Sequence, residues 1–439
     1  MSTIDEHSFP MIKCPYENIC SIGADLMSRT ILHVDANAFY VGCEMSENPS
    51  LRGKAVVVGG DVEARHGIVL AKSDKAKAAG IKTGLVLWQA KQLCPGLIIC
   101  PPNYRLYLRM SRELRNIMGD YSGHVEPFGL DEAWVGLGPE PIEEGRRIAD
   151  EIRRRAWEEL GITVSVGVAD NKIMAKLGSD YKKPDATTVI APEDYPRIVW
   201  PLPVGELLYV GPATQKKLHN MAIDTIGDLA NMPREVLTSK FGVNGDMIWR
   251  FARGLDTSEV AATGYSPDIK SIGNSTTTPR DLVTDEDVNL TVWVLAESVA
   301  ERLREHGFRA KTIQLYVRDN GLASFERQVR LRRPTKLADE IAHAAMDLFQ
   351  ANYNLSCQPP LRSVGVRAGD LVTDDGNVQL SIFAEDARRL NLELIEHAID
   401  GIRKRFGHFA IQRASMLGDR IGEINPKDDH IIHPVGWTR

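Results

Sequence analysis

Cysteine is scarce in this chain, with six among 439 residues at irregular spacings. So few thiols cannot build a disulfide framework. Cys14 and Cys20 have no second pair with which to hold zinc, so we expect reduced thiols. Long apolar runs are also lacking, because stretches such as 55–58 and 84–90 are far shorter than the ~18–20 residues that span a bilayer. The acidic N-terminus precedes no apolar segment, so the sequence predicts a cytoplasmic protein without a secretory signal.

Neither sign of charge dominates the composition. The chain has 53 basic and 59 acidic residues and a formal net charge of −6, which argues against a surface coated with nucleic acid unless the charges are segregated. Hydrophobic residues make up 43% and charged residues 26%, a balance typical of globular proteins rather than disordered, collagen-like or coiled-coil chains. At roughly 100–200 residues per domain, the length predicts two to four domains.

The first half of the chain predicts a mixed α/β domain. Residues 1–28 show no clear period and are expected to form an extension. From there to about residue 200, apolar runs and alternating patterns are interleaved with helical patterns. We expect strands at 29–35, 54–58 and 162–168, a hairpin at 125–135, and helices at 70–93 (in two pieces), 104–118 and 142–160.

The second half predicts a helical segment and a small α+β domain. Pro201 and Pro203 mark a boundary, and glycines then separate short helical pieces over 204–256. After a polar connector, residues 274–384 predict the order strand, helix, strand, strand, helix, strand. The expected strands are 275–278, 312–318, 326–331 and 361–366, the helices are 288–306 and 337–352, and one more helix is expected at about 387–404.

Three carboxylates stand out because they occur in apolar surroundings. Asp35 ends a buried strand, and Asp131 and Glu132 lie in the predicted hairpin. Clustered acids need compensation, and two Mg²⁺ ions could provide it while activating a 3′-hydroxyl and stabilising pyrophosphate. Adjacent strand residues point to opposite faces, so Asp131 and Glu132 can converge only if the bend redirects one of them. The alternative is that these acids are solvated at strand ends.

Three segments together resemble the Y-family DNA polymerases. Residues 33–44 read His-Val-Asp-Ala-Asn-Ala-Phe-Tyr-Val-Gly-Cys-Glu, similar to the first motif of the family. Residues 129–134, Gly-Leu-Asp-Glu-Ala-Trp, resemble its S-x-D-E-A motif. Residues 163–177, followed by Lys-Lys-Pro at 182–184, resemble its third block. The resemblance is colinear from about residue 30 to 415. It is greatest to the DinB branch, with the UmuC-like branch as the near relative.

This resemblance implies a right-hand polymerase with palm, small fingers, a helix-hairpin-helix thumb and an α+β little finger. The fold class is therefore α/β and α+β multidomain. The implied divisions are an extension at 1–28, palm at 29–48 and 108–200, fingers at 49–107, thumb at 201–258, a linker at 259–270, little finger at 271–385, and a C-terminal helix and tail at 386–439.

The resemblance also assigns the catalytic site. Asp35 and Asp131 are expected to bridge two Mg²⁺ ions, Glu132 to bind the catalytic ion, and the backbone carbonyl of Ala36 to complete the shell of the nucleotide ion. Tyr40 falls at the steric gate, where a planar ring under the sugar leaves no room for a 2′-hydroxyl. A core tyrosine is the alternative at that position.

Two lysines are expected to bind the triphosphate, Lys183 and Lys77. The family usually has a tyrosine and an arginine in the fingers, and this chain has Asp74 and Lys77 in their places. Lys77 keeps the charge and loses the bidentate geometry of arginine, and Asp74 is expected to repel a triphosphate unless a lysine pairs with it. The family's frequent aspartate is Asn37 here, at a position that is not a metal ligand.

Two regions are expected to contact DNA. Residues 208–218 predict a helix-hairpin-helix turn in which Gly211 precedes the helix, with Tyr209 at the usual first glycine; such turns hold backbone phosphate through amide groups. Residues 306–336 carry eight basic residues against two acidic ones, which predicts a phosphate-tracking sheet. The contacts expected there are Arg309, Lys311, Arg327, Arg330, Arg332 and Arg333.

A pentapeptide after the α+β domain suggests a protein partner. Gln379-Leu380-Ser-Ile-Phe383 resembles the Q-L-x-L-F peptide by which bacterial polymerases bind the sliding clamp, and short extended peptides with apolar anchors suit a groove. The other expected partners are primed DNA and deoxynucleoside triphosphates, and the chain is expected to be a monomer.

The sequence therefore predicts an error-prone, template-directed DNA polymerase for translesion synthesis and DNA repair. The expected domains leave no room for a proofreading exonuclease. One rival is a nucleotidyl cyclase with a similar metal palm, which needs no primer. The other is a clamp- and DNA-binding scaffold with a decayed site, suggested by Asp74 and Lys77, although the three acids are all present.

Overall fold

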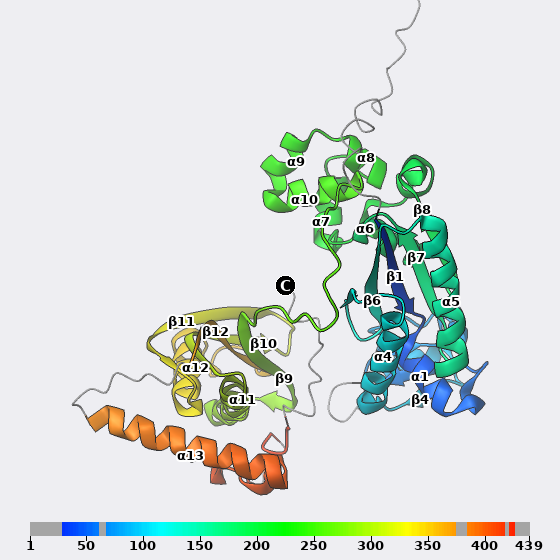
Figure 1. Ribbon diagram of the computed structural model, residues 1–439. Helices are drawn as coiled ribbons and strands as arrows, with labels where there is room; N and C mark the ends of the chain where they lie inside the picture. Colours follow the sequence, from blue (N-terminus) through cyan, green and yellow to red (C-terminus); the bar gives the residue numbers. More distant parts are fainter. Residues whose placement is uncertain (1–28, 61–66, 375–383, 418–420, 426–439) are drawn as a thin grey trace, which may run out of the picture. The chain divides into compact units, whose positions relative to one another are not determined.

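The computed structural model describes residues 29–60, 67–374, 384–417 and 421–425 (Figure 1). The described residues fall into two compact units, one made by residues 29–47 and 106–265 and the other by 48–105 and 266–425. Across the part of the chain that the structure describes, no helix is both long and apolar enough to cross a membrane.

The first unit contains a five-stranded sheet in the order β5-β6-β1-β7-β8. β1 lies in the middle, antiparallel to β6 and β7, and β8 runs parallel to β7. All seven residues of β1 are buried, as its apolar sequence predicts for a central strand. The strands are β1 (Thr30–Ala36), β5 (Val125–Pro127), β6 (Glu132–Gly138), β7 (Val164–Ala169) and β8 (Thr187–Ile190). The predicted hairpin is confirmed as β5 and β6.

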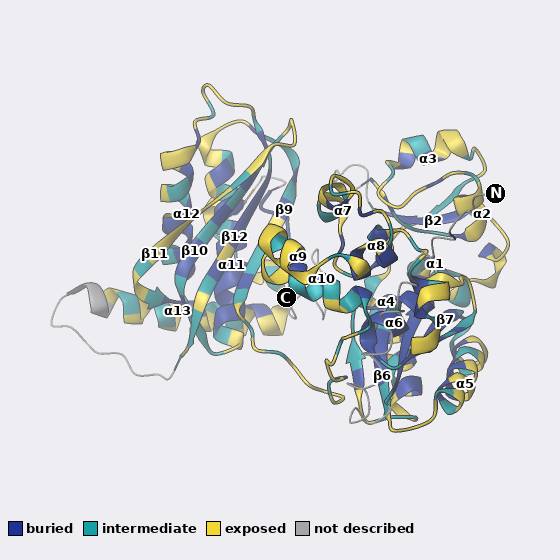
Figure 2. Ribbon diagram, turned by 90° about the horizontal axis from the view of Figure 1, so that it is seen from above, coloured by how far each residue is buried: buried dark blue, intermediate teal, exposed yellow. Residues whose placement is uncertain are grey.

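Helices α5 and α6 cover opposite faces of this sheet, and glycines allow both to come close. A Cβ at Gly145 of α5 would lie within 2.9 Å of Thr30 and Val168, and a Cβ at Gly167 of β7 would lie 1.9 Å from the carbonyl oxygen of Ala175 in α6. Figure 2 shows the exposed residues of α5 on its outer side. The helices of the palm-like region are α1 (Phe39–Glu47), α4 (Tyr104–Gly119), α5 (Ile142–Leu160) and α6 (Lys172–Tyr181).

Four short helices complete the first unit and share a core with the sheet. Apolar side chains such as Ile223 and Leu237 join a cluster that also contains Ile173 and Trp134. Arg29 ties the connector to the sheet, because its guanidinium donates to the carbonyl oxygen of Asp256 at 2.6 Å. The helices are α7 (Pro212–His219), α8 (Ile226–Asn231), α9 (Arg234–Phe241) and α10 (Val243–Ala252), as the glycine-punctuated pattern predicts.

Residues 48–105 form a small three-stranded sheet in the order β3-β2-β4. The expectation of helix from residue 70 onward is wrong at its start, because Val69–Lys72 is strand β3 and pairs with β2. Ser73 then caps the next helix by accepting from the amide of Ala76. The elements are β2 (Val56–Gly59), β3, β4 (Ile98–Cys100), α2 (Asp74–Ala78) and α3 (Leu87–Leu93).

Residues 266–373 form the predicted α+β domain, with a four-stranded antiparallel sheet in the order β11-β10-β12-β9. Helices α11 and α12 cover one face and share a core with it. The element order is confirmed, and the strands are longer than predicted. They are β9 (Ser271–Leu282), β10 (Phe308–Asp319), β11 (Ser324–Thr335) and β12 (Leu361–Thr373), with helices α11 (Asp285–Glu305) and α12 (Ala338–Asn352).

A final helix, α13 (Ala384–Phe406), packs beside α11 and α12 and slightly exceeds its predicted range. The segment beyond it returns to the same core through Met416, Ile421 and Ile424. Single turns of 3₁₀-helix occur at 49–51, 192–194, 204–206, 408–410 and 414–416, and a π-helical turn at 195–199.

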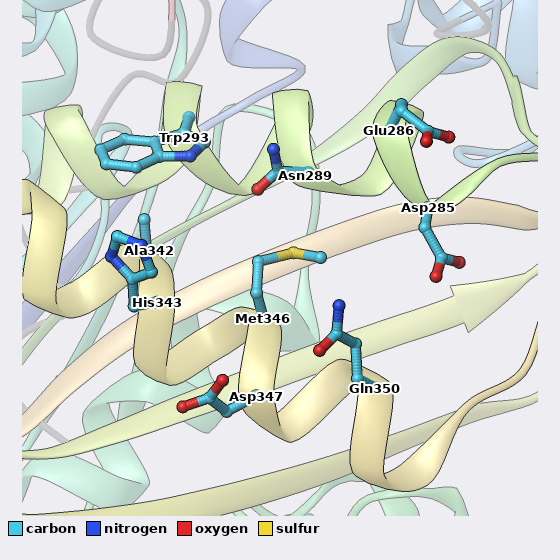
Figure 3. A pocket seen from close by; sticks show the side chains of 9 residues that line it. All are labelled: Asp285, Glu286, Asn289, Trp293, Ala342, His343, Met346, Asp347 and Gln350. Atoms are coloured by element: carbon cyan, nitrogen blue, oxygen red, sulfur yellow. The ribbon is translucent and has the colours of Figure 1, made fainter.

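Between α11 and α12 lies a shallow groove of about 340 Å³ (Figure 3). Trp293 and Met346 line it together with acids that include Asp285 and Glu286. Both acids lie in the first turn of α11, where negative charge stabilises the helix, so their helical position accounts for them.

Candidate active site

Strand alternation places Asp35 on the face that α6 covers. His33 pairs with Gly167 of β7, and Gly167 contacts the backbone of α6. Asp35 is two residues further along β1 and therefore points to the same face. Across the sheet Asp35 is opposite Glu132 of β6, and the amide of Ala36 donates to the carbonyl oxygen of Asp131 at 2.9 Å. The sheet register thus brings the predicted acids together.

Gly129 explains how two consecutive acids converge. Its φ is +147°, a conformation that favours glycine, and it lies at the bend before β6. A Cβ built there would be 3.2 Å from Oδ1 of Asp131 and 3.9 Å from Oε1 of Glu132. Both carboxylates therefore lie beside the space that a side chain at residue 129 would occupy. Asp131 lies just before β6 begins, so strand alternation does not separate it from Glu132.

Two ammonium groups compensate the carboxylates. Nζ of Lys176 lies 2.7 Å from Oε2 of Glu132 and 3.2 Å from Oδ2 of Asp35. Nζ of Lys183 lies 3.0 Å from Oδ2 of Asp35. Asp180 joins both lysines, at 3.1 Å and 2.8 Å. Lys176 and Asp180 were not predicted as site residues; their four-residue spacing on the helix after the third motif is the signal that could have indicated them.

The cluster shifts several pKa values. Burial raises the pKa of Glu132 to about 7, Lys176 opposes the shift, and the charges of Asp35 and Asp131 add to it. Burial disfavours charge on Lys176 and Lys183, but the neighbouring carboxylates outweigh it and raise both pKa values. The site therefore places cationic lysines beside buried carboxylates, and these carboxylates need nearby positive charge to stay ionised.

His33 lies fully buried behind Glu132. Its Nδ1 is 2.8 Å from the hydroxyl of Ser179, and its Nε2 is 3.4 Å from Oε2 of Glu132. Burial holds the pKa of His33 well below its usual value, and the charges of Lys176 and Lys183 lower it further. A neutral imidazole therefore limits the positions that the Glu132 carboxylate can take. Its place two residues before Asp35 on one strand face could have revealed it from the sequence.

The donor set fits divalent cations. Potential ligand atoms of His33, Asp35 and Glu132 lie within 4.8 Å of one another, and Asp131 reaches the same side of Gly129. Three carboxylates suit hard cations such as Mg²⁺ or Mn²⁺. Acids arranged in this way on the central strand and the adjoining hairpin could hold divalent cations of the kind that assist phosphoryl transfer.

Comparison with known proteins agrees with this geometry. The impB/mucB/samB family matches residues 34–180, its C-terminal domain matches 269–382, and the thumb domain of DNA polymerase-iota matches 206–256. The chain is 47% identical to DNA polymerase IV of Acetivibrio thermocellus over 396 residues, which is 90% of this chain and 99% of that protein. It is 36% identical to DNA polymerase IV 1 of Bacillus subtilis over 394 residues, 89% of this chain and 94% of that protein.

The chain belongs to the Y family of DNA polymerases, in its DinB branch. A solved structure of a Y-family chimera of Dbh and Dpo4 has the same fold, with a TM-score of 0.69 and 21% identity over 78% of this chain and 99% of that chain. Helices α7–α10 lie within the thumb-domain match at 206–256, and the four-stranded sheet lies within the C-terminal-domain match at 269–382. We call the five-stranded sheet and its helices the palm, residues 48–105 the fingers, helices α7–α10 the thumb, and the domain of the four-stranded sheet the little finger.

In the palm, Tyr40 stacks face to face on a buried tyrosine. Its ring centroid lies 4.4 Å from that of Tyr107, with 15° between the planes, and the Tyr107 hydroxyl donates to Glu44 at 2.7 Å. Tyr40 itself is partly exposed, so its ring is both fixed and accessible. Asn37 has a structural role, because its side chain accepts from the amide of Asp185 at 2.9 Å and donates to Ser165 at 3.0 Å.

In the fingers, Asp74 and Lys77 lie on the short helix α2. Asp74 is in the first turn and Lys77 is in the last. At these positions each charge interacts favourably with the helix dipole. Both side chains are exposed. Local helix stability therefore accounts for Asp74, whose presence the triphosphate does not explain.

The thumb turn has the predicted hairpin form. Tyr209 has a φ of +69°, the left-handed conformation that glycine adopts most readily, and its ring packs 6.1 Å from that of Phe251. Gly211 precedes α7 as its N-terminal cap, with Pro212 as the first helical residue. The amides at this helix N-terminus are those expected to meet a phosphate.

The little finger has one face covered by α11 and α12 and one face without a helix among the described residues. Cross-strand pairs share a face, which places Arg330 with Thr312 and Arg367 with Gln314 on the uncovered side, while Ile313 on β10 faces the core. Arg367 was not predicted, because the strand was expected to end one residue earlier. Hydroxyls and glycines of β9 and β12 adjoin these cations, namely Ser275, Thr277, Ser363 and Gly365.

Two predicted DNA contacts make interactions within the domain. Arg327 pairs with Leu315 on the helix-covered side and donates to Asn352 of α12 at 3.1 Å. The guanidinium of Arg309 lies 2.8 Å from Asp374. Lys311, Arg332 and Arg333 lie on β10 and β11 as predicted. The pentapeptide at 379–383 lies outside the described residues.

Proposed function

We propose that this chain is a template-directed DNA polymerase that adds deoxynucleotides to a primer 3′ end during translesion synthesis and DNA repair. The observation that carries the proposal is the convergence of Asp131 and Glu132 over Gly129, opposite Asp35 and beside two lysines. Membership in the DinB branch supports the same activity. Primed DNA and deoxynucleoside triphosphates are the substrates.

Each metal ligand of the chain would have its own role in a two-metal phosphoryl transfer. Asp35 and Asp131 would hold both Mg²⁺ ions, Glu132 would hold the ion at the 3′-hydroxyl, and the carbonyl oxygen of Ala36 would complete the other shell. The bound ions would supply Lewis-acid activation and neutralise charge at phosphorus. Lys183, 3.0 Å from Asp35, is placed to meet a triphosphate, with Lys77 as its partner from the fingers. Tyr40 would exclude a 2′-hydroxyl.

Backbone recognition supports templated synthesis. The amides before α7, including that of Gly211, would bind phosphate, and the uncovered face of the little finger would track the duplex through Arg330 and Arg367. Lys311, Arg332 and Arg333 extend the same basic surface. We retain the domain limits 29–48 and 108–200 for the palm, 49–107 for the fingers, 201–258 for the thumb and 271–385 for the little finger.

Low fidelity and low processivity follow from this design. The small fingers offer little surface to check the shape of the base pair. We propose that a monomer in the cytoplasm gains processivity by binding the sliding clamp through Gln379, Leu380 and Phe383. A single-nucleotide misincorporation assay tests fidelity, and accuracy like that of a replicative polymerase would contradict it.

Primer extension with Mg²⁺ and dNTPs tests the catalytic assignment. Wild-type protein is compared with Asp131→Asn, Glu132→Gln and the matched control Glu158→Gln, which changes an exposed acid on α5. Loss of several kcal/mol of charge stabilisation corresponds to about a thousandfold or more in rate. We expect that loss in the first two variants and wild-type rates in the control. Wild-type protein that binds primed DNA without extending it would favour the non-catalytic scaffold, and product without a primer would favour a cyclase.

A further inference from the structure

Helix α13 is attached to the little finger by its charged face. Within residues 388–406, the side chains that contact the domain recur at helical spacing, at positions 389, 393, 396, 400 and 403. Arg304 of α11 donates to Asp400 at 2.6 Å and also pairs with Glu396. Arg403 meets Glu297 of α11 at 2.7 Å. The inner face of this helix is therefore made of ion pairs.

The outer face of α13 is apolar. Leu390, Leu394, Ala398, Ile402 and Phe406 follow one another at intervals of four residues, which places them in a stripe that winds around the side of the helix opposite the ion pairs. Leu394 and Phe406 are 70% and 66% exposed, and Ile395 beside them is 54% exposed. We call these six residues the α13 ridge. A surface helix normally buries its apolar side and exposes its charges, and α13 does the reverse, so the ridge needs a partner.

The charges around the ridge argue against a second copy of this chain. The exposed charged residues on this side of α13 are Arg388 and Arg405, both basic, and the acids of residues 388–406 are those of the inner face. Two ridges packed parallel would bring Arg405 against Arg405, and packed antiparallel they would bring Arg388 against Arg405. Like charges at an interface are costly, so the partner is expected to carry acids around an apolar surface.

We propose that the α13 ridge is a second contact surface for the sliding clamp that binds Gln379–Phe383, an inference that rests on the clamp binding proposed above. The peptide ends at Phe383 and α13 begins at Ala384. Leu390 and Leu394 follow the peptide by seven and eleven residues, which is about 10–16 Å along a helix. A protein that holds the peptide is therefore within reach of the first turns of the ridge. The required clamp surface is apolar and bordered by carboxylates.

Clamp affinity measured by surface plasmon resonance tests the proposal, with the sliding clamp of the same organism immobilised and the full chain as analyte. The ridge variant is Leu394→Glu with Ile402→Glu. His397→Glu is the control, since it adds one carboxylate at an exposed position of the same helix outside the ridge. Gln379→Ala with Phe383→Ala removes the peptide contact. Clamp-free primer extension by each variant verifies that the chain is folded.

We expect the ridge variant to bind the clamp at least tenfold more weakly than wild type, with His397→Glu unchanged and clamp-free extension intact. Ridge and control variants that both bind within twofold of wild type, while the peptide variant fails to bind, would overturn the ridge contact and leave clamp binding in place. Failure of the wild-type chain to bind the clamp would overturn both. If the wild-type chain sediments as a dimer and the ridge variant as a monomer, a second copy of this chain is the occupant, and this result would also overturn the proposal.

Discussion

Tyr40 is oriented in part by stacking on a buried ring. Its ring stacks on Tyr107, which is fully buried and bonded to Glu44. Replacing Tyr40 with alanine removes the plane that a 2′-hydroxyl would strike. We expect Tyr40→Ala to raise the relative incorporation of ribonucleotides roughly a hundredfold, the scale of a steric pocket's discrimination. Single-nucleotide insertion with a dNTP and the matching rNTP measures this.

The control for that experiment is Tyr107→Phe, which keeps the stacked ring and removes only the hydroxyl. Its discrimination is expected to equal that of the wild type. If Tyr40→Ala discriminated between the dNTP and the rNTP as well as the wild type does, Tyr40 would be a core residue rather than a contact of the sugar.

The three clustered acids could be identified because they occur in short motifs, whereas their geometry could not be predicted. The φ of Gly129 decides that Asp131 and Glu132 converge, and no pattern of neighbouring residues specifies that angle. His33 and Lys176 were also missed as site residues. Their spacing along the strand and the helix could have suggested them, but their contact with Glu132 joins residues separated by 99 and 44 positions, and it depends on the strand register and the packing of α6.

Helix α11 begins with a capping box that is also an acid-sensitive site. Asp287 accepts from the amide of Thr284 and pairs with Arg280, and the Arg280 hydrogen bond lowers its pKa to about 2. A depressed carboxyl pKa stabilises the fold above the unfolded value, near 4, and this stabilisation is lost as pH falls toward 2. We expect Asp287→Asn to lower the free energy of unfolding by roughly 1–2 kcal/mol at pH 7, after allowance for solvent screening.

Urea unfolding followed by circular dichroism at pH 7 and at pH 4 measures this effect. Asp285→Asn, in the same first turn, is the control and is expected to cost a few tenths of a kcal/mol. The gap between wild type and Asp287→Asn is expected to narrow at the lower pH. A gap that widens on acidification would contradict the assignment.

The thumb hairpin contains a residue in an unfavourable conformation. Tyr209 holds a φ of +69°, and a non-glycine residue there costs roughly 1–2 kcal/mol, partly offset by packing on Phe251. Tyr209→Ala loses the ring and keeps the strain, whereas Tyr209→Gly loses both. We therefore expect the glycine variant to be about 1 kcal/mol more stable than the alanine variant, as urea midpoints would show. An alanine variant of equal or greater stability would mean that the turn relaxes.

Element order was more predictable than element ends. The helix at 142–160 was predicted at its observed limits because its apolar stripe is regular, and the little finger has the predicted order. Val69–Lys72 was missed as a strand because four residues are too few to show alternation, and its pairing with β2 is a tertiary contact. Arg367 escaped notice for a related reason, since β12 continues past its apolar run to Thr373.

At the scale of the whole molecule, a chain with net charge −6 can bind DNA because its basic residues are unevenly distributed. β11 carries five basic or amide side chains that are exposed, Arg327, Gln328, Arg330, Arg332 and Arg333, at the edge of the little finger sheet. Of these, Gln328 and Arg330 lie on the face opposite the core. Binding through such a surface depends on displaced counterions and hence on salt.

We therefore expect arginines on the uncovered face of the little finger to contribute to DNA binding, and a similar arginine on the helix-covered face not to contribute. Each phosphate contact contributes about 0.9 to the slope of log affinity against log salt. Arg330→Ala with Arg367→Ala is expected to reduce that slope by nearly 2 and to weaken primed DNA binding at every template sequence. Arg327→Ala is the matched control, because Arg327 is exposed and basic but shares a face with Leu315 and bonds Asn352. Fluorescence anisotropy across a salt series measures both. If Arg327→Ala changed the slope as much as the double variant does per residue, DNA binding would follow total charge, and the face on which an arginine lies would have no part in it.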